Sequence, residues 1–357
     1  MEGHPIDIVI FAPLAPILGV VLFWFIQLLF IESQKYFLEK IRPKHKPLCR
    51  FTNLLGILFQ TICHALGFTV TKSGISEFYI SVNYGKVAPK KQKKGIFEWV
   101  SNAFLFLGPF FIPASLLLIC LIFLMRSGFE ITILEQFAEL KYTFVGQLVA
   151  FGTSLSSFST SFFSFLGSLD LLHPGHLGFL ILMIFLGMGI RPSYIGEQKV
   201  SRVDMVYDLR NIWSLIRNKP LYIPIIFSFA YLVFYLSLFF SQDWYITIFI
   251  FLGWLSIVSI ASITISHLII FLIKTTDEIP GFWKLVPYLM LPISYILIRT
   301  LFYFFITDYT FSVSLIVMII STILVTYYLM RAKSDRFKTI REMKLLKKKT
   351  QGDADEQ

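Results

Sequence analysis

The sequence predicts an all-α polytopic membrane protein with about seven transmembrane helices, one short partial helix and a small cytoplasmic β segment. Hydrophobic residues make up 56% of the 357 residues and charged residues only 15%, and the mean hydropathy is +0.71. A soluble domain has about 25% charged residues, and a soluble fold of this size cannot bury so much apolar surface. The composition therefore excludes a cytosolic enzyme, a secreted disulfide-stabilised domain and a soluble nucleic-acid-binding protein.

Seven stretches are long and apolar enough to cross the hydrocarbon region of a bilayer, which takes about 20 residues. They are Ile8–Ile31, Asn102–Met125, Leu172–Ile190, Leu221–Phe240, Trp244–Ile273, Leu285–Ile306 and Phe311–Met330. An eighth stretch, Leu54–Phe68, has 15 residues and contains three polar side chains, Gln60, Thr61 and His64. We interpret it as a partial or re-entrant helix, with a short crossing shielded by neighbouring helices as the alternative.

The basic residues predict the orientation of the chain. All 32 Lys and Arg residues except Arg126, Lys141 and Arg299 lie in five segments, 32–51, 72–99, 191–219, 274–284 and 331–357. If Leu54–Phe68 does not cross, these segments share one side, and the positive-inside rule places the N-terminus outside and the C-terminus in the cytoplasm. If it does cross, the first segment lies opposite the other lysine-rich segments. In a membrane protein, a net charge of +10 reflects these basic cytoplasmic segments. We therefore expect anionic membrane lipids as partners and do not expect nucleic acid.

The spans and connections divide the chain into four parts. They are an N-terminal anchor helix with a basic cytoplasmic linker (1–52), a core (53–218), a four-helix membrane bundle (219–330) and a cytoplasmic tail, first basic and then acidic (331–357). The core holds the partial helix, the β segment, two spans and an outer loop, whose Gly152–Ser168 part we expect to form a helix on the outer surface or dipping into it. Apolar residues at helical intervals predict an interfacial helix over Gly196–Asn218.

A β segment is predicted between the partial helix and the second span. Phe78, Ile80, Val82 and Tyr84 alternate with polar or small residues, and glycines lie at both ends of the segment, a pattern typical of a strand. The N–H and C=O groups of non-helical backbone beside a membrane-embedded helix need hydrogen-bond partners from protein or from a water-filled cavity.

These elements resemble, in their order, the site-2-type intramembrane zinc metalloproteases. That family has His-Glu-x-x-His on a short helix, then a cytoplasmic β segment, then a helix with a Gly-Pro pair, and a distant helix with the remaining metal ligand. The corresponding segments here are Gln60-Thr61-Ile62-Cys63-His64, the strand Ile75–Tyr84, the Gly108-Pro109 pair and the run Leu186–Ser193. The resemblance covers roughly residues 53–210.

The resemblance also implies that this site is degenerate. Gln60 stands where the family has its first ligand His, Thr61 stands where it has the general-base Glu, and only His64 matches. No His or Asp near Gly189–Ser193 is available as a third ligand. Gln is a weak neutral ligand for zinc and Thr is no base near neutral pH. We therefore expect no catalytic residues and no cofactor, with His64 at best a single metal ligand.

Other polar or reactive residues receive structural interpretations. Arg299, inside the seventh span, is expected to extend its side chain to the outer interface or to pair with Asp170 or Glu130. His267 is a second intramembrane polar residue. The pair His173 and His176 is interpreted as capping a helix end at the outer surface, across the bilayer from His64. Three cysteines without C-x-x-C spacing predict no disulfide framework.

The function predicted from the sequence is that of a non-catalytic relative of these proteases. We expect a membrane scaffold that binds a transmembrane or juxtamembrane client, whose unwound backbone adds to the edge of the Phe78–Tyr84 strand. One alternative is an intramembrane zinc metalloprotease with an atypical ligand set around His64. Another is a transporter or channel, which predicts inverted repeats and paired broken helices. The sequence gives neither the client nor the oligomeric state.

Overall fold

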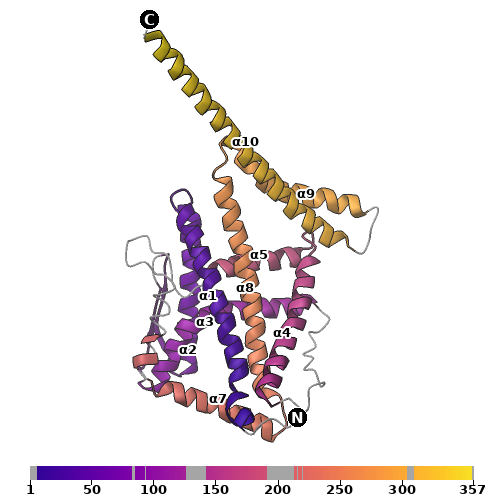
Figure 1. Cartoon of the computed structure of the whole chain (residues 1–357). Coiled ribbons are helices and arrows are strands. Elements are labelled where there is room, and N and C mark those ends of the chain that lie inside the picture. Colours follow the sequence, from indigo (N-terminus) through magenta and orange to yellow (C-terminus); the bar gives the residue numbers. More distant parts are fainter. Residues whose placement is uncertain are drawn as a thin grey trace. The chain divides into compact units, whose positions relative to one another are not determined.

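The structure of the protein is a computed structural model (Figure 1). It describes residues 6–82, 85–92, 94–125, 142–190, 213–214, 216–218, 220–303 and 309–355. The chain forms two compact units. Unit 1 comprises Met1–Phe165 and Leu171–Leu268, and unit 2 comprises Leu166–Asp170 and Ile269–Gln357.

Unit 1 contains most of the helices and the β-hairpin. Its elements are the short π-helix η1 (Asp7–Phe11), α1 (Leu14–Ile41), α2 (Lys46–Val70), β1 (Ile75–Ile80), β2 (Gly85–Pro89), α3 (Ile96–Met125), α4 (Phe144–Gly167, except its last two residues), α5 (Pro174–Gly189), α7 (Tyr222–Phe239) and α8 (Trp244–Thr276) as far as Leu268. Unit 2 contains the end of α8, the 3-10 helix η3 (Gly281–Leu285), α9 (Val286–Tyr303) and α10 (Thr310–Asp355).

The prediction of an all-α polytopic membrane protein is confirmed. Seven helices in the described part of the chain are long and apolar enough to cross a membrane, and the only sheet found there is the two-stranded β1–β2 hairpin. The seven segments are Asp7–Ile41, Lys46–Val70, Leu107–Leu124, Tyr222–Phe239, Trp244–Thr276, Gly281–Phe302 and Thr310–Ala332. The number agrees with the prediction, but two of the assignments differ.

The predicted partial helix, Leu54–Phe68, is the central part of the 25-residue helix α2. The sequence indicated only this part because the first two turns of α2 contain Lys46, Arg50 and Asn53, which lower the local hydropathy. The basic segments 32–51 and 72–99 consequently adjoin opposite ends of α2. A single cytoplasmic side for both is therefore incompatible with an α2 that crosses the membrane, and the orientation of the termini stays a prediction.

The predicted span Leu172–Ile190 is a 16-residue helix, α5, which is shorter than the roughly 20 residues of a full crossing. Its start is set by Pro174 in the first turn, where a missing N–H costs nothing. The predicted interfacial helix over Gly196–Asn218 lies mostly outside the described residues, which include only its last few positions.

A helix is found where one was predicted for Gly152–Ser168: α4 covers this segment up to Gly167 and contacts α8 and α1 through aromatic rings, while its place relative to the membrane surface stays a prediction. Phe158 of α4 stacks on Trp254 of α8 with ring centroids 4.8 Å apart. Phe151 of α4 lies edge-on to Phe23 of α1 at 6.4 Å. Helix α4 is rich in serine, and its two threonines donate within the helix, Thr153 to the carbonyl of Val149 at 2.8 Å and Thr160 to the carbonyl of Ser156 at 3.0 Å. Such internal bonds allow a serine-rich helix to be buried.

Helices α1 and α8 run parallel and are joined by hydrogen bonds along their length. Tyr245 of α8 donates to the carbonyl of Pro13 near the start of α1. Further along, Gln27 donates to the carbonyl of Ser256 at 3.4 Å. Gln34 donates to the hydroxyl of Ser266 at 2.9 Å.

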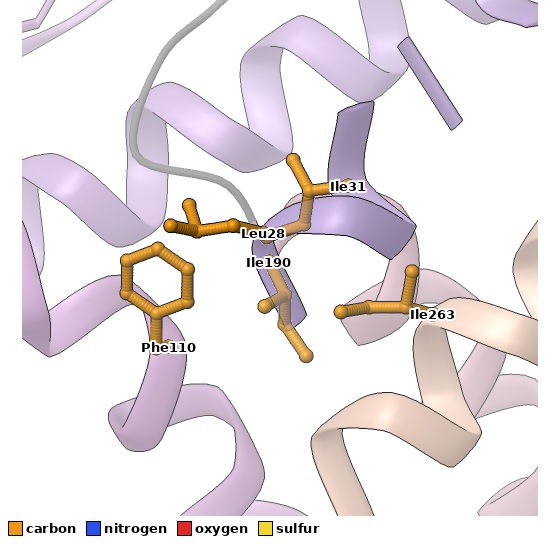
Figure 2. Packing of buried hydrophobic residues seen from close by; sticks show 5 residues of the cluster. All are labelled: Leu28, Ile31, Phe110, Ile190 and Ile263. Atoms are coloured by element: carbon orange, nitrogen blue, oxygen red, sulfur yellow. The ribbon is translucent and has the colours of Figure 1, made fainter. Parts of the chain in front are cut away.

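The apolar core of unit 1 lies where this pair meets α3 and the end of α5. Figure 2 shows that the side chains of Leu28 and Ile31 from α1, Phe110 from α3, Ile190 after α5 and Ile263 from α8 converge there. All five are fully or almost fully buried. This core joins segments that lie far apart in the sequence into one unit.

Tyrosines hold the N-terminal end of α1. Pro13 has no N–H to donate to the carbonyl of Val9, its partner four residues earlier in a regular helix. Tyr235 of α7 donates to that carbonyl instead, at 2.6 Å, and Tyr231 donates to the carbonyl of Ile10 at 2.7 Å. The tyrosines thus supply donors that the irregular π-helix lacks.

We predict that Gly187→Ala destabilises unit 1 by about 1–3 kcal/mol, the usual cost of overpacking. A Cβ atom at Gly187 would overlap the backbone carbonyl of Ser262 in α8 and lie 2.7 Å from the hydroxyl of Ser266. Backbone atoms inside a packed helix cannot move aside cheaply. The measurement is the thermal unfolding of the detergent-purified protein. Gly178→Ala, on the same helix with open space around its Cβ position, is the matched control and should leave the transition unchanged or slightly raised.

Candidate functional site

The β-hairpin lies directly on the part of α2 that carries Thr61. Strands β1 and β2 are antiparallel, with Ile80 opposite Gly85, and Figure 1 shows the hairpin beside α2. A Cβ atom at Gly85 would overlap the hydroxyl oxygen of Thr61 and lie 2.9 Å from Cγ2 of Ile57. Only glycine permits this approach of the strand backbone to the helix.

Helix α3 contacts α2 through glycines contributed by both helices. A Cβ atom at Gly108 of α3 would lie 2.8 Å from Cβ of Cys63, and one at Gly67 of α2 would lie 2.9 Å from Cβ of Phe104. Small residues at such contacts let membrane helices approach closely. The Gly108-Pro109 pair therefore lies against the helix that carries Gln60, Thr61 and His64.

The end of α5 contacts another face of α2. A Cβ atom at Gly189 would lie 2.6 Å from Cε2 of Phe59 and 3.1 Å from Cβ of Leu55. The four segments that the sequence analysis singled out therefore meet around α2, as far as they are described. Arg191 and the two residues after it lie outside the described residues.

Gln60 and His64 occupy one stripe of α2, since they are one turn apart. At about 100° per residue, this stripe falls between the face that contacts α3 and the face beneath β2. Both side chains are half-buried. The ring of His64 lies against that of Phe68, with centroids 4.4 Å apart and planes inclined by 33°. An amide and an imidazole thus lie side by side at the boundary between the hairpin and α3.

Thr61 lies beneath the strand at Gly85 and not on the stripe of Gln60 and His64. Its side chain is 5% exposed, and its hydroxyl donates to the carbonyl of Ile57 at 2.6 Å in the same helix. In the described part of the chain, no group of three or more His, Cys, Asp or Glu residues is placed to hold a metal ion. Gln60 and His64 can donate and accept hydrogen bonds. The expectation that no zinc is bound stays a prediction.

The predicted client-binding residues lie on and beside β1. Phe78 is 50% exposed, Val82 is 36% exposed and Ile80 is half-buried; Tyr84 lies outside the described residues. The sheet has two strands, so one edge of β1 pairs with β2 and no strand in the described residues pairs with its other edge.

The two other intramembrane polar residues have neighbours in the structure. Within unit 2, Arg299 of α9 forms an ion pair with Asp170 at 4.0 Å and lies over the ring of Phe311 at 4.4 Å. Pairing is thus the arrangement observed, and Glu130, the other acidic residue considered, lies outside the described residues. His267 of α8 packs edge-on against Phe37 of α1, with ring centroids 4.8 Å apart.

Sequence reasoning did not find the residues that assemble this site. Gly85 was interpreted only as the end of a strand, although it is the point where the strand touches α2. Gly189 was interpreted as part of a helix end, although it contacts α2 near Phe59. A glycine within a predicted strand or helix, beside a segment that resembles a functional motif, is the signal that indicates such a close approach.

The fold defines a multi-pass helical integral membrane protein. Comparisons of the chain with protein-family models, with curated proteins and with solved structures found no match.

We predict that Gly85→Ala lifts the hairpin from α2, lowers the stability by about 1–3 kcal/mol and speeds protease cleavage of the hairpin. Combining it with Thr61→Ala should restore part of the stability, because the overlapping hydroxyl is then absent while the 2.9 Å approach to Ile57 remains. Thermal unfolding and limited proteolysis of the purified protein measure both effects.

The control is Gly152→Ala in α4, where a Cβ atom meets nothing within 4 Å. A Gly85→Ala protein as stable and as protease-resistant as the parent would contradict the seating of the hairpin on α2.

Proposed function

We propose that the protein is a non-catalytic scaffold of the site-2-protease type that binds an unwound transmembrane or juxtamembrane segment of a client protein. The observation that carries this proposal is the hairpin seated on α2 at Gly85, over Thr61, the residue next to Gln60. The proposal has three parts: a strand edge, an apolar surface and a pair of polar side chains.

The strand edge offers main-chain hydrogen bonds to a client. The edge of β1 that faces away from β2 carries backbone N–H and C=O groups suited to pairing with an extended segment. Strand addition of this kind gives affinity through the backbone and therefore needs no particular client sequence. The close contact of Gly85 with α2 holds this edge at a fixed place beside the helix.

An apolar surface adjoins the hairpin. The exposed large apolar side chains at the end of α2, on β1 and at the start of α3 are Leu66, Val70, Phe78, Tyr79, Ile96 and Phe97. These segments are consecutive, and both strands contact α2. The surface suits the apolar side chains of a segment that leaves the bilayer.

Gln60 and His64 suit the polar backbone of such a segment. A helix that unwinds in the membrane exposes peptide groups whose lack of partners costs several kcal/mol each. The amide of Gln60 and the imidazole of His64 each offer a donor and an acceptor, and both are half-buried rather than fully covered. In this proposal they bind client peptide groups, and Thr61 has no role as a base.

We predict that the protein, reconstituted in lipid nanodiscs, binds a synthetic transmembrane peptide with a central Asn-Pro break at least tenfold more tightly than an unbroken Leu/Ala peptide of equal length. Only the broken peptide presents free backbone groups. Fluorescence energy transfer between labelled peptide and labelled protein measures the affinity.

Two variants locate this binding. Ile80→Pro in β1 and the double variant Gln60→Ala/His64→Ala should each weaken binding of the broken peptide, whereas Tyr327→Phe, on an exposed position of α10, should not. Equal binding of the two peptides, or binding that neither variant changes, would refute the proposal.

Metal analysis separates the scaffold from a zinc protease built around His64. We predict that His64→Ala leaves the zinc content of the detergent-purified protein unchanged, because one imidazole beside an amide does not retain zinc. A loss of stoichiometric zinc on this substitution would favour the protease.

A further inference from the structure

Two histidines meet at the start of α5. His173 is the residue that precedes the helix, and His176 lies in its first turn. Their ring centroids are 4.8 Å apart and their planes are inclined by 50°. His173 is exposed and His176 is half-buried, so the pair is accessible from outside the protein.

The separation of the two rings suits binding of one metal ion by both. In a tetrahedral zinc site each imidazole nitrogen lies about 2.0–2.1 Å from the metal, so two rings that share the metal have centres about 5 Å apart. The observed 4.8 Å is close to this value.

The sequence His-Pro-Gly-His explains why the rings meet. The residue that caps a helix and the residue three positions later are neighbours, as in a capping box. Pro174 fixes the backbone of the first turn. Gly175 leaves room for the first ring, because a Cβ atom there would lie 3.1 Å from Cε1 and 3.3 Å from Nδ1 of His173.

The interpretation of these histidines as helix caps is not supported for His173, which forms no side-chain capping hydrogen bond. The other ring is held from the side by Phe165 of α4, which lies edge-on to His176 at 5.7 Å. An imidazole that is not used for capping thus lies next to a second imidazole that is held in place.

We propose that His173 and His176 chelate one divalent transition-metal ion of the class that prefers imidazole, namely Cu²⁺, Ni²⁺ or Zn²⁺. The partial positive charge of the helix N-terminus opposes a cation, which favours the ions that bind imidazole most strongly. Affinity is therefore expected to be highest for Cu²⁺. The site is separate from Gln60 and His64 and does not depend on the proposed function.

The test is titration of the full chain, purified in detergent without a polyhistidine tag, with Cu²⁺ alone. Electron paramagnetic resonance should show one copper per chain bound by two imidazole nitrogens. His173→Gln and His176→Gln should each weaken binding at least tenfold and leave one imidazole signal, and His45→Gln should change neither.

Gly175→Ala tests the geometry while keeping both ligands. The added methyl group displaces the ring of His173, so binding should weaken severalfold, whereas Gly178→Ala, with open space around it, should bind copper as the parent does. Copper bound by fewer than two imidazoles, or binding that neither glutamine variant weakens, would overturn the proposal.

Discussion

The need to satisfy polar groups without water governs the packing of unit 1. Gln34 of α1 is almost fully buried, and its amide nitrogen bridges the carbonyl of Gly187 in α5, at 3.3 Å, and the hydroxyl of Ser266 in α8, at 2.9 Å. A buried amide inside a membrane has no water to bond to, so the amide of Gln34 needs protein partners. This one side chain therefore joins three helices, and it places the end of α5 where Gly189 reaches α2.

The candidate site is formed by close approaches that require the absence of side chains. Gly85, Gly108 and Gly189 bring a strand and two helices to within contact of α2. Between membrane helices, packing contacts replace the hydrophobic effect as the source of association, because lipid is as apolar as the side chains. These three contacts therefore fix the shape of the site. Gln60 and His64 lie on the stripe of α2 between the contact with Gly85 and the contact with Gly108.

Much of the fold could be predicted from hydropathy, because most of its spanning helices are long apolar runs. Hydropathy did not reveal the full length of α2 or the packing of α4. Lys46 and Arg50 lower the hydropathy of the first turns of α2, and the threonine hydroxyls of α4, on Thr153 and Thr160, bond to its own backbone. A hydropathy scale scores each residue by its type and does not register hydrogen bonds between a side chain and the backbone of its own helix.

The site was predictable only in part. The spacing of Gln60 and His64 placed both on one stripe of a helix, and the alternation around Phe78 indicated a strand. The partner strand β2 was not separable as an element, because Lys86 to Pro89 has no alternating pattern of its own. The sequence offered Asp170 as one of two acidic partners for Arg299 but could not select it, because the contact joins residues 129 positions apart and local patterns do not encode it.

The position of Thr61 bears on the proposal of a non-catalytic site. A general base must stand at the surface of a water-filled site, and a carboxylate inside the membrane is costly. Here the strand backbone at Gly85 lies against the hydroxyl of Thr61, and a Cβ atom at Gly85 would overlap it. The hydroxyl of Thr61 donates to the carbonyl of Ile57 in the same helix. In the proposed scaffold, a strand seated this closely on the helix suits the binding of a backbone better than the activation of water.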